Sequence, residues 1–418
     1  MYFVREKYLS RIRPFYSDTE LIKVLTGVRR CGKSTILNMV KDELIKSGVN
    51  EKNIIYISLD KRPYRSIEND KELEKIIDDK TANADGKKFL FIDEVQRAKG
   101  FESLLDALRQ EDYSIFITGS NSYLLSGELT TYLTGRYIEF EIQTLSFDEY
   151  CQMKEFYKGH VNYFPENEFK NYILEGGFPY AVTLDSQVEK ELYVKSVVDE
   201  IYLKDIKQNR KIRNKEQFLK VQQYIINNFG CQTSIDALCK SFITESGKPL
   251  RRATMYNYLK ILEDAHIISR CRRFDLKSKK SIKGEEKYYL SDLSFYFAQN
   301  INKTINYGPV LENIFYNYLK SKNYEASIGK IGNLEVDFII RNRLNNGFSY
   351  AQIALTIFGE DLLENGISKV EEREYRSLEK INDFYPKYVF TLDKLQQQRS
   401  GIKHLNICDF MYEGKELD

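Results

Sequence analysis

The stretch Leu21-Ile-Lys-Val-Leu-Thr-Gly-Val-Arg-Arg-Cys-Gly-Lys-Ser-Thr35 predicts the fold of the first third of the chain. A short apolar strand runs into a loop that fits the pattern G-x-x-x-x-G-K-[ST] from Gly27 to Ser34. Apolar residues then recur at helical spacing between Ile36 and Ile45, and Ser47-Gly48 is a typical helix end. A strand, a glycine loop and a helix in this order indicate an α/β domain with the parallel sheet of P-loop nucleotide-binding proteins.

Each residue type in this loop has a physical task in binding a nucleotide. Glycines let backbone N–H groups turn toward phosphate oxygens, the Lys33 ammonium can bridge the β- and γ-phosphates, and the Ser34 hydroxyl can bind Mg²⁺. Arg29 and Arg30 either contact phosphate or a partner, or pair with acidic side chains. We therefore expect ATP and Mg²⁺ as ligands, with binding residues Gly27, Val28, Arg29, Arg30, Cys31, Gly32, Lys33, Ser34, Thr35 and Asp93.

A second motif supports this interpretation. Phe89-Leu-Phe-Ile92 is a buried-strand pattern that ends in Asp93-Glu94. A carboxylate at the end of a strand can reach a metal ion held by Ser34, and Glu94 can polarise a water molecule for cleavage of the γ-phosphate. The alternative is that both acids only cap the next helix. ATP hydrolysis is our hypothesis, with Ser34 and Asp93 at the metal and Glu94 as the carboxylate that activates water.

Two further positions are candidates for the catalytic set. The predicted strand Ser114–Thr118 runs into polar residues, and we expect Asn121 or Ser120 to face the γ-phosphate and sense the nucleotide state. Arg136 opens the next predicted strand and could be an arginine finger, acting in cis or across a subunit interface. An ordinary surface salt bridge is the alternative for Arg136.

Length and composition limit the other possibilities. A chain of 418 residues is too long for one hydrophobic core, and 42% apolar with 30% charged residues indicates folded domains. No apolar run approaches the ~18 residues of a membrane helix, and charges stand where a signal peptide would be apolar, so we expect a cytoplasmic protein without membrane contact. Six scattered cysteines and three isolated histidines predict neither a disulfide framework nor a zinc site.

Several motifs together resemble one protein family. These are Gly-Val-Arg-Arg-x-Gly-Lys-Ser, Phe-Ile-Asp-Glu-Val-Gln, Ile-Thr-Gly-Ser-Asn-Ser, Gly-Arg-Tyr and Glu-Gly-Gly-Phe-Pro. The chain resembles, nearly end to end, bacterial and archaeal AAA-superfamily ATPases that carry a C-terminal domain of unknown function with a restriction-endonuclease-like pattern. The resemblance implies an ATPase core, a helical lid that includes Gly176–Pro179, a winged helix and a nuclease-like terminus. It also implies nucleotide and metal roles for Lys33, Ser34 and Asp93, and catalytic roles for Glu94, Asn121 and Arg136.

The middle of the chain is strongly basic. Residues Lys211–Leu290 contain seventeen Lys or Arg and eight Asp or Glu, a balance of +9, so the rest of the chain sums to −7. Such a segment favours a polyanionic partner, because neutralising phosphates releases counterions; a solvated surface is the alternative. We expect DNA.

The same segment has the pattern of a winged helix. Two helices with apolar faces at helical spacing precede two predicted strands, Ile267–Phe274 and Glu286–Leu290. Between the strands, the run Lys277–Lys283 is expected to form a charged wing tip. The expected DNA contacts are Arg252, Thr254, Asn257 and Lys260 on the second helix and Lys279, Lys280 and Lys283 in the wing.

The terminal segment has an incomplete nuclease pattern. Restriction-type nucleases place an Asp on one strand and [EQ]-x-Lys on its neighbour, because carboxylates hold Mg²⁺ and the lysine orients or deprotonates water. Glu312, Asp337 and Gln352 match this pattern, but Ala354 stands at the lysine position. We therefore expect a degenerate, noncatalytic domain; compensation by Lys330 or a displaced lysine is the alternative.

The predicted fold class is α/β: a P-loop NTPase parallel sheet, followed by a helical lid, a winged helix and a C-terminal α/β nuclease-like domain. The expected boundaries are 1–150, 151–210, 211–294 and 295–418. The favoured hypothesis is an ATPase that couples nucleotide state to DNA binding, in a homo-oligomer if Arg136 acts across an interface. The rivals are a regulatory nucleotide-binding protein with little turnover and an ATP-gated, metal-dependent nuclease.

Overall fold

The computed structural model describes residues 2–119, 133–159, 164–207, 212–243, 247–276, 280–300, 304–343, 346–363 and 367–418, with the backbone alone for 280–285. The chain forms two compact units. The first consists of Met1–Thr144, Glu200–Lys211 and Asp264–His266, and the second of Leu145–Asp199, Ile212–Glu263 and Ile267–Asp418. The finer division into four domains remains a prediction.

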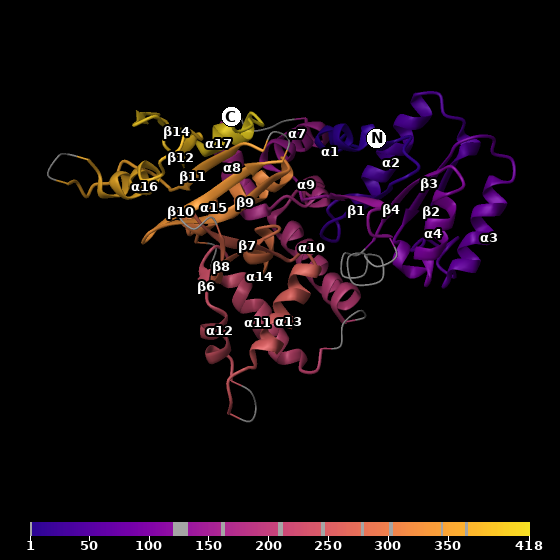
Figure 1. The fold of residues 1–418 in the computed structure, drawn as a ribbon, viewed down its shortest axis with the longest axis horizontal. Coiled ribbons are helices and arrows are strands. Elements are labelled where there is room, and N and C mark those ends of the chain that lie inside the picture. The colour runs from indigo at the N-terminus through magenta and orange to yellow at the C-terminus, as the bar shows by residue number, and fades with distance from the viewer. Residues whose placement is uncertain are drawn as a thin grey trace. The chain divides into compact units, whose positions relative to one another are not determined.

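The first unit is built on a parallel sheet (Figure 1). In the described residues it has five strands, in the order β2 (Ile54–Ser58), β3 (Lys88–Asp93), β4 (Tyr113–Thr118), β1 (Ile22–Thr26) and β5 (Tyr137–Glu141). Its helices are α1 (Glu6–Ile12), α2 (Lys33–Lys46), α3 (Asp70–Thr81) and α4 (Phe101–Arg109), with 3₁₀ turns η1 (Arg13–Phe15), η2 (Glu51–Asn53) and η3 (Val95–Arg97) and the π-helix η4 (Ile201–Lys207). The predicted P-loop NTPase sheet is therefore confirmed.

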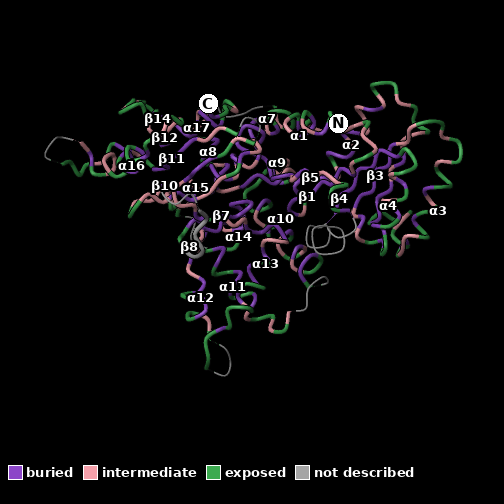
Figure 2. The backbone as a smooth tube through the Cα atoms, in the orientation of Figure 1, coloured by how far each residue is buried: buried purple, intermediate pink, exposed green. Residues whose placement is uncertain are grey.

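Helices cover both faces of this sheet. One face packs aliphatic strand residues against apolar side chains of α3 and α4, including Leu73 and Leu105. On the other face, Phe91 and Phe116 stack with ring centroids 4.8 Å apart, and Lys41 of α2 lies over the ring of Tyr56. Strands buried on both sides explain why their sequences are continuous apolar runs and do not alternate. The buried strands appear in purple in Figure 2.

The second unit contains a mixed sheet. In the described residues it has nine strands, in the order β13 (Gln398–Arg399), β14 (Ile402–Asn406), β12 (Lys387–Thr391), β11 (Phe348–Ile353), β10 (Leu334–Asn342), β9 (Tyr324–Ile331), β7 (Ile268–Asp275), β8 (Lys280–Leu290) and β6 (Gln232–Thr233). The helix α15 (Tyr307–Ser321) packs on one face, where Phe315 contacts Phe338 and Phe390. The helix α16 (Lys369–Glu379) contributes Tyr375 and Leu378 to a second core with Val336 and Val389.

The remaining helices of the second unit lie before, between or after the strands of this sheet in the chain. They are α7 (Phe147–Lys158), α8 (Pro165–Glu175), α9 (Pro179–Thr183), α10 (Gln187–Glu200), α11 (Lys215–Asn227), α12 (Ile235–Ser241), α13 (Arg252–Asp264), α14 (Ser294–Gln299) and α17 (Ile407–Tyr412). Within the described ranges, the helices are all too short or too polar to cross a membrane.

The hairpin β7–β8 belongs to the same sheet as the C-terminal strands. The strand β7 pairs in parallel with β9 through Arg273↔Ile328, Phe274↔Gly329 and Asp275↔Lys330. Hydrogen bonds of one sheet thus continue across the boundary predicted at residue 294.

The Gly176-Gly177 pair is a tight packing point within the second unit. The Gly177 N–H donates to Asp292 Oδ2 at 2.8 Å, and a Cβ on Gly177 would lie 2.3 Å from the carbonyl oxygen of Leu145. Gly176 has φ +76° and also faces the Asp292 carboxylate. Since no side chain fits there, the glycine motif is explained by packing.

Gly177→Ala should destabilise the full-length protein by about 1–3 kcal/mol, because the added methyl forces the backbone at Leu145 to move. Gly308→Ala is the matched control, since a Cβ at Gly308 meets nothing within 4 Å. Urea unfolding of both variants measures the difference, and equal stability of the two variants would refute the packing role.

Candidate functional site

The loop between β1 and α2 requires glycine at both glycine positions of its pattern. Gly27 has φ +134° and Gly32 has φ +106°, a backbone region that L side chains rarely adopt. A Cβ on Gly27 would also lie 2.1 Å from the carbonyl oxygen of Ile142. The two glycines thus let the chain turn sharply from the strand into the N-terminus of α2, where unpaired backbone N–H groups and the helix dipole favour an anion.

The Lys33 side chain lies within this loop. Its ammonium donates to the carbonyl oxygens of Gly27 and Val28, at 2.9 Å and 3.1 Å, and the residue is buried. These two carbonyl groups keep the Lys33 ammonium beside the loop. Phosphate oxygens of a bound nucleotide could replace the carbonyl oxygens as hydrogen-bond acceptors there. Cys31 is buried, and its carbonyl accepts a hydrogen bond from Arg5 at 3.1 Å, while Thr35 is exposed on α2.

Asp93 is the centre of a hydroxyl cluster beside the loop. Its Oδ1 accepts from Ser34 Oγ at 2.8 Å and from Thr118 Oγ1 at 2.5 Å, and its Oδ2 accepts from Ser58 Oγ at 3.1 Å. Ser58, Asp93 and Thr118 end three neighbouring parallel strands, so the sheet itself brings them together. Ser58 and Thr118 were not predicted as site residues from the sequence, although both carry the recognisable signal of a polar residue that ends an apolar strand.

Glu94 stands directly after this cluster in a left-handed conformation, with φ +59°. Its backbone N–H donates to Thr118 Oγ1 at 3.1 Å, and the Gln96 amide donates to its carboxylate at 2.6 Å. A non-glycine residue in this conformation costs about 1–3 kcal/mol, which neighbouring contacts must offset. The strained backbone and the Gln96 contact together fix the direction of the Glu94 carboxylate.

Arg29 and Arg30 of the loop pair with acids from a distant part of the chain. Arg29 makes a two-pronged contact with Asp205, at 2.9 Å and 2.7 Å, and lies 3.8 Å from Glu200. Arg30, which is exposed and has φ +69°, pairs with Glu200 at 3.0 Å. The two interpretations of these arginines were contact with phosphate or a partner, and pairing with acidic side chains. The structure shows pairing with acids, which lie about 170 residues further along the chain.

The two other predicted catalytic residues are not part of this cluster. Asn121, like Ser120, lies outside the described residues. Arg136 directly precedes β5, whose first residue, Tyr137, pairs with Ile22, the first residue of β1. Arg136 therefore lies at the amino edge of the sheet, whereas the loop follows the carboxyl end of β1 at the opposite edge. Its guanidinium pairs with Asp106 at 2.7 Å. A five-residue strand spans roughly 16 Å, so Arg136 lies far from the loop, and its assignment as an arginine finger remains a prediction.

The basic segment exposes the residues expected to face DNA. Arg252, Asn257 and Lys260 are exposed on α13 and Thr254 is partly exposed, while the opposite face of the helix is buried through Met255, Tyr258, Leu259 and Leu262. Lys279 lies outside the described residues. The predicted wing-tip loop is shorter than expected, because β8 begins at Lys280, which pairs with Asp275, and so includes Lys283.

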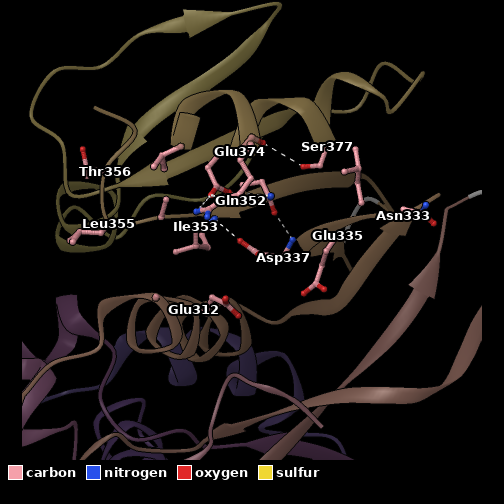
Figure 3. Close-up of a pocket in the computed structure, with 15 residues that line it drawn as sticks. Glu312, Asn333, Glu335, Asp337, Gln352, Ile353, Leu355, Thr356, Glu374 and Ser377 are labelled. Carbon is pink, nitrogen blue, oxygen red and sulfur yellow. Dashed lines mark hydrogen bonds and ion pairs between the residues drawn. The ribbon is translucent and has the colours of Figure 1, made fainter. Parts of the chain in front are cut away.

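The predicted nuclease residues line a cavity of about 600 Å³ in the second unit (Figure 3). Gln352 Oε1 accepts from the Asp337 N–H at 2.6 Å, and its amide donates to Glu374 at 3.2 Å. Asp337 Oδ2 accepts from the Ile353 N–H at 2.8 Å. Glu312 faces the same cavity from α15, so Glu312, Asp337 and Gln352 are brought together as expected.

A lysine does contact carboxylates that line this pocket, but from an unexpected strand. Lys287 of β8 lies 2.9 Å from Glu312 Oε2, 3.0 Å from Glu335 Oε1 and 3.9 Å from Asp337 Oδ1. Ala354 lines the cavity without a charge, and Lys330 is placed on β9 with its backbone carbonyl accepting from the Leu276 N–H. Lys287 was not predicted as a residue of this pocket, because the strand that carries it was assigned to a different domain.

Burial and crowding of carboxylates alter titration in the pocket. Burial, reinforced by Glu312, raises the pKa of Asp337 from its usual 3.8 to about 7. Burial, reinforced by Asp337, raises the pKa of Glu374 to about 7. For Lys287 burial acts to lower the pKa, but Glu312, Asp337 and Glu335 outweigh it and raise the pKa above its usual value. The lysine is therefore a permanent cation at physiological pH.

Comparisons with known proteins agree with the loop geometry. The AAA_14 family, described as an AAA domain, matches residues 19–151, and a domain of unknown function, DUF8612, matches residues 166–304. The first unit is thus an AAA-type P-loop domain. The Walker-type ATPase PABY2304 of Pyrococcus abyssi aligns with a TM-score of 0.48 at 15% identity, over 71% of this chain and 95% of that one.

Two relatives are similar in sequence. An uncharacterized protein of Haemophilus influenzae is 30% identical over 411 residues, which is 98% of each chain. The uncharacterized protein MJ1544 of Methanocaldococcus jannaschii is 31% identical over 333 residues, 76% of this chain and 72% of that one. The chain belongs to the same family as these proteins, and its AAA domain occupies residues 19–151.

The raised pKa values predict a pH dependence of stability. Between about pH 4 and 7 the folded protein keeps protons on Asp337 and Glu374 that the unfolded chain releases, so their contribution to stability is lost as the pH rises through about 7. Asp337→Asn removes one of these titrations. The melting temperature of the variant minus that of wild type should therefore increase between about pH 5 and 8. A difference that stays constant over this pH range would contradict the raised pKa of Asp337.

Proposed function

We propose that this protein binds ATP with Mg²⁺ at the loop Gly27–Thr35 and hydrolyses it, and that the nucleotide state controls DNA binding by the basic segment. The observation that carries the first part is the cluster of Ser34, Asp93 and Thr118 beside a loop that buries Lys33. An anion-binding loop, a metal-binding pair and a positioned carboxylate are the parts that phosphoryl transfer to water requires.

The donor set fits Mg²⁺. The Ser34 hydroxyl and the Asp93 carboxylate are adjacent oxygen donors at 2.8 Å, and Mg²⁺ commonly uses one or two such groups together with waters and substrate phosphates. A cluster of three or more acidic, His or Cys ligands is not needed, and the described ranges contain none. Ser34 and Asp93 would hold the ion, which when bound supplies positive charge to the β- and γ-phosphates.

The other residues of the site have separate tasks in this proposal. The Gly27–Gly32 backbone and the N-terminus of α2 would bind phosphate oxygens, and Lys33 would neutralise charge that develops on them. Glu94 would accept a hydrogen bond from the attacking water and take its proton. Its direction is set by Gln96 and by the Thr118 hydroxyl, which also contacts Asp93. Thr118 thus connects the metal-binding residue to the catalytic one.

The proposed DNA contact rests on charge and on element order. The segment from α11 through α13 to the hairpin β7–β8 has the order helix, short strand, two helices, two strands, with β6 pairing to β8. This is the order of a winged helix, whose second helix of the pair enters the major groove. The exposed Arg252, Asn257 and Lys260, with the +9 balance of Lys211–Leu290, support a phosphate-binding surface.

Substitutions in the loop and at Glu94 separate binding from turnover. Lys33→Ala removes a charged hydrogen-bond donor worth about 1.5–3 kcal/mol, so ATP affinity should fall roughly ten- to hundredfold. Glu94→Gln should leave affinity within about twofold and lower turnover roughly 10²–10⁴-fold, because it removes the general base. Fluorescent-nucleotide binding and phosphate release measure the two effects.

Lys46→Ala, an exposed lysine at the far end of α2, is the matched control and should change neither quantity. Equal turnover in wild type and Glu94→Gln would favour a regulatory nucleotide-binding protein with little catalysis. Assays at several protein concentrations report assembly, because an arginine supplied across an interface makes turnover per chain rise with concentration.

Neutralising Lys279, Lys280 and Lys283 together tests the wing. Binding should weaken by a similar factor for all DNA sequences, and the slope of log affinity against log salt should become shallower by about 0.9 for each phosphate that the wing no longer neutralises. Lys220→Ala, an exposed lysine of α11, should leave the slope unchanged. An unchanged slope in the triple variant would mean that the wing does not contact the DNA backbone.

A further inference from the structure

The most unusual charged group outside the nucleotide site is Lys287. Its side chain is only 7% exposed, yet it lies among carboxylates that come from two other elements, Glu312 on α15 and Glu335 and Asp337 on β10. A buried lysine of this kind must be paired, because taking its charge out of water is costly. Three facing carboxylates more than satisfy that requirement.

Each carboxylate of the group is also held by neutral donors. Tyr289 donates its hydroxyl to Glu312 Oε2 at 2.8 Å, and the Gln232 side chain donates to Glu335. Asp337 uses Oδ2 to accept the Ile353 N–H, which leaves Oδ1 facing the lysine. Glu312 Oε2, both oxygens of Glu335 and Asp337 Oδ2 thus already contact protein donors.

The ammonium occupies the place of a metal ion in this cluster. Mg²⁺ requires oxygens at about 2.0–2.1 Å in a nearly octahedral arrangement, whereas the Glu312 and Glu335 oxygens are spaced about the lysine Nζ at 2.9 Å and 3.0 Å. A divalent ion at these oxygens would have to displace the ammonium, which contacts Glu312 and Glu335 directly. Among the described residues, no cluster of three or more His, Cys, Asp or Glu side chains has the geometry to hold a metal ion. The residues present therefore do not fit the Mg²⁺ that the nuclease pattern implies.

We propose that Lys287 is the resident cation of this pocket and that the wild-type pocket consequently takes no divalent metal ion. The lysine supplies from within the chain the positive charge that the Glu312, Glu335 and Asp337 carboxylates need. It also ties the hairpin β7–β8 to α15 and β10, so the charge network has a structural role. This proposal concerns the second unit alone and is independent of ATP hydrolysis by the first.

Titration of Mn²⁺ alone into the full-length protein, without nucleotide, tests the proposal by calorimetry. Wild type and Glu312→Gln should give the same heats, because no metal binds through Glu312. Lys287→Met should gain a Mn²⁺ site at least about tenfold tighter than any in wild type. That gain should disappear in the double variant with Glu312→Gln, and Lys220→Met, which removes an exposed lysine, should behave as wild type.

Two results would overturn the proposal. One is Mn²⁺ binding to wild type that Glu312→Gln abolishes, which would show that the pocket holds a metal despite the lysine. The other is a folded Lys287→Met protein with no new Mn²⁺ site, which would show that Lys287 is not what excludes the ion. Should Lys287→Met fail to fold, the comparison of wild type with Glu312→Gln still decides the first point.

Discussion

The parallel register of β1, β3 and β4 is the constraint on which the nucleotide site depends. Parallel strands end at the same edge of a sheet, so the loop after β1, the acid after β3 and the hydroxyl at the end of β4 meet without further adjustment. Asp93, the last residue of β3, then connects the start of α2 with the ends of β4 and β2, because it accepts from Ser34, Thr118 and Ser58. A one-residue slip of β3 would turn this side chain to the opposite face of the sheet.

The loop is additionally held by a segment that is distant in the sequence. Glu200 and Asp205 belong to the first unit although α7, α8 and α9 of the second unit precede them, and they pair with Arg30 and Arg29. Asp205 lies in a π-helix, a strained form that is frequent at functional positions. A phosphate group bound in the loop would compete with these carboxylates for the same guanidinium groups. The ion pairs of the segment would therefore weaken when phosphate binds in the loop.

Local patterns predicted the parts of the protein that depend on neighbours in the sequence. Gly27, Lys33 and Asp93 could be assigned because a loop between a strand and a helix, and an acid at the end of a strand, have short-range signals. Arg136 could not, because its distance from the loop depends on the direction and pairing of β5. Lys287 and Asp205 were missed since their partners lie 25 to 176 residues away, where spacing contains no information.

The shared sheet of the second unit also determines how this chain can be divided. The strand β7 has β8 on one side and β9 on the other, and β9 lies beyond residue 294. A fragment ending there would leave β7 with unpaired backbone N–H and C=O groups along one edge. Exposed edges of this kind recruit strands from other molecules, so the isolated basic segment would be prone to self-association even if every helix in it folded.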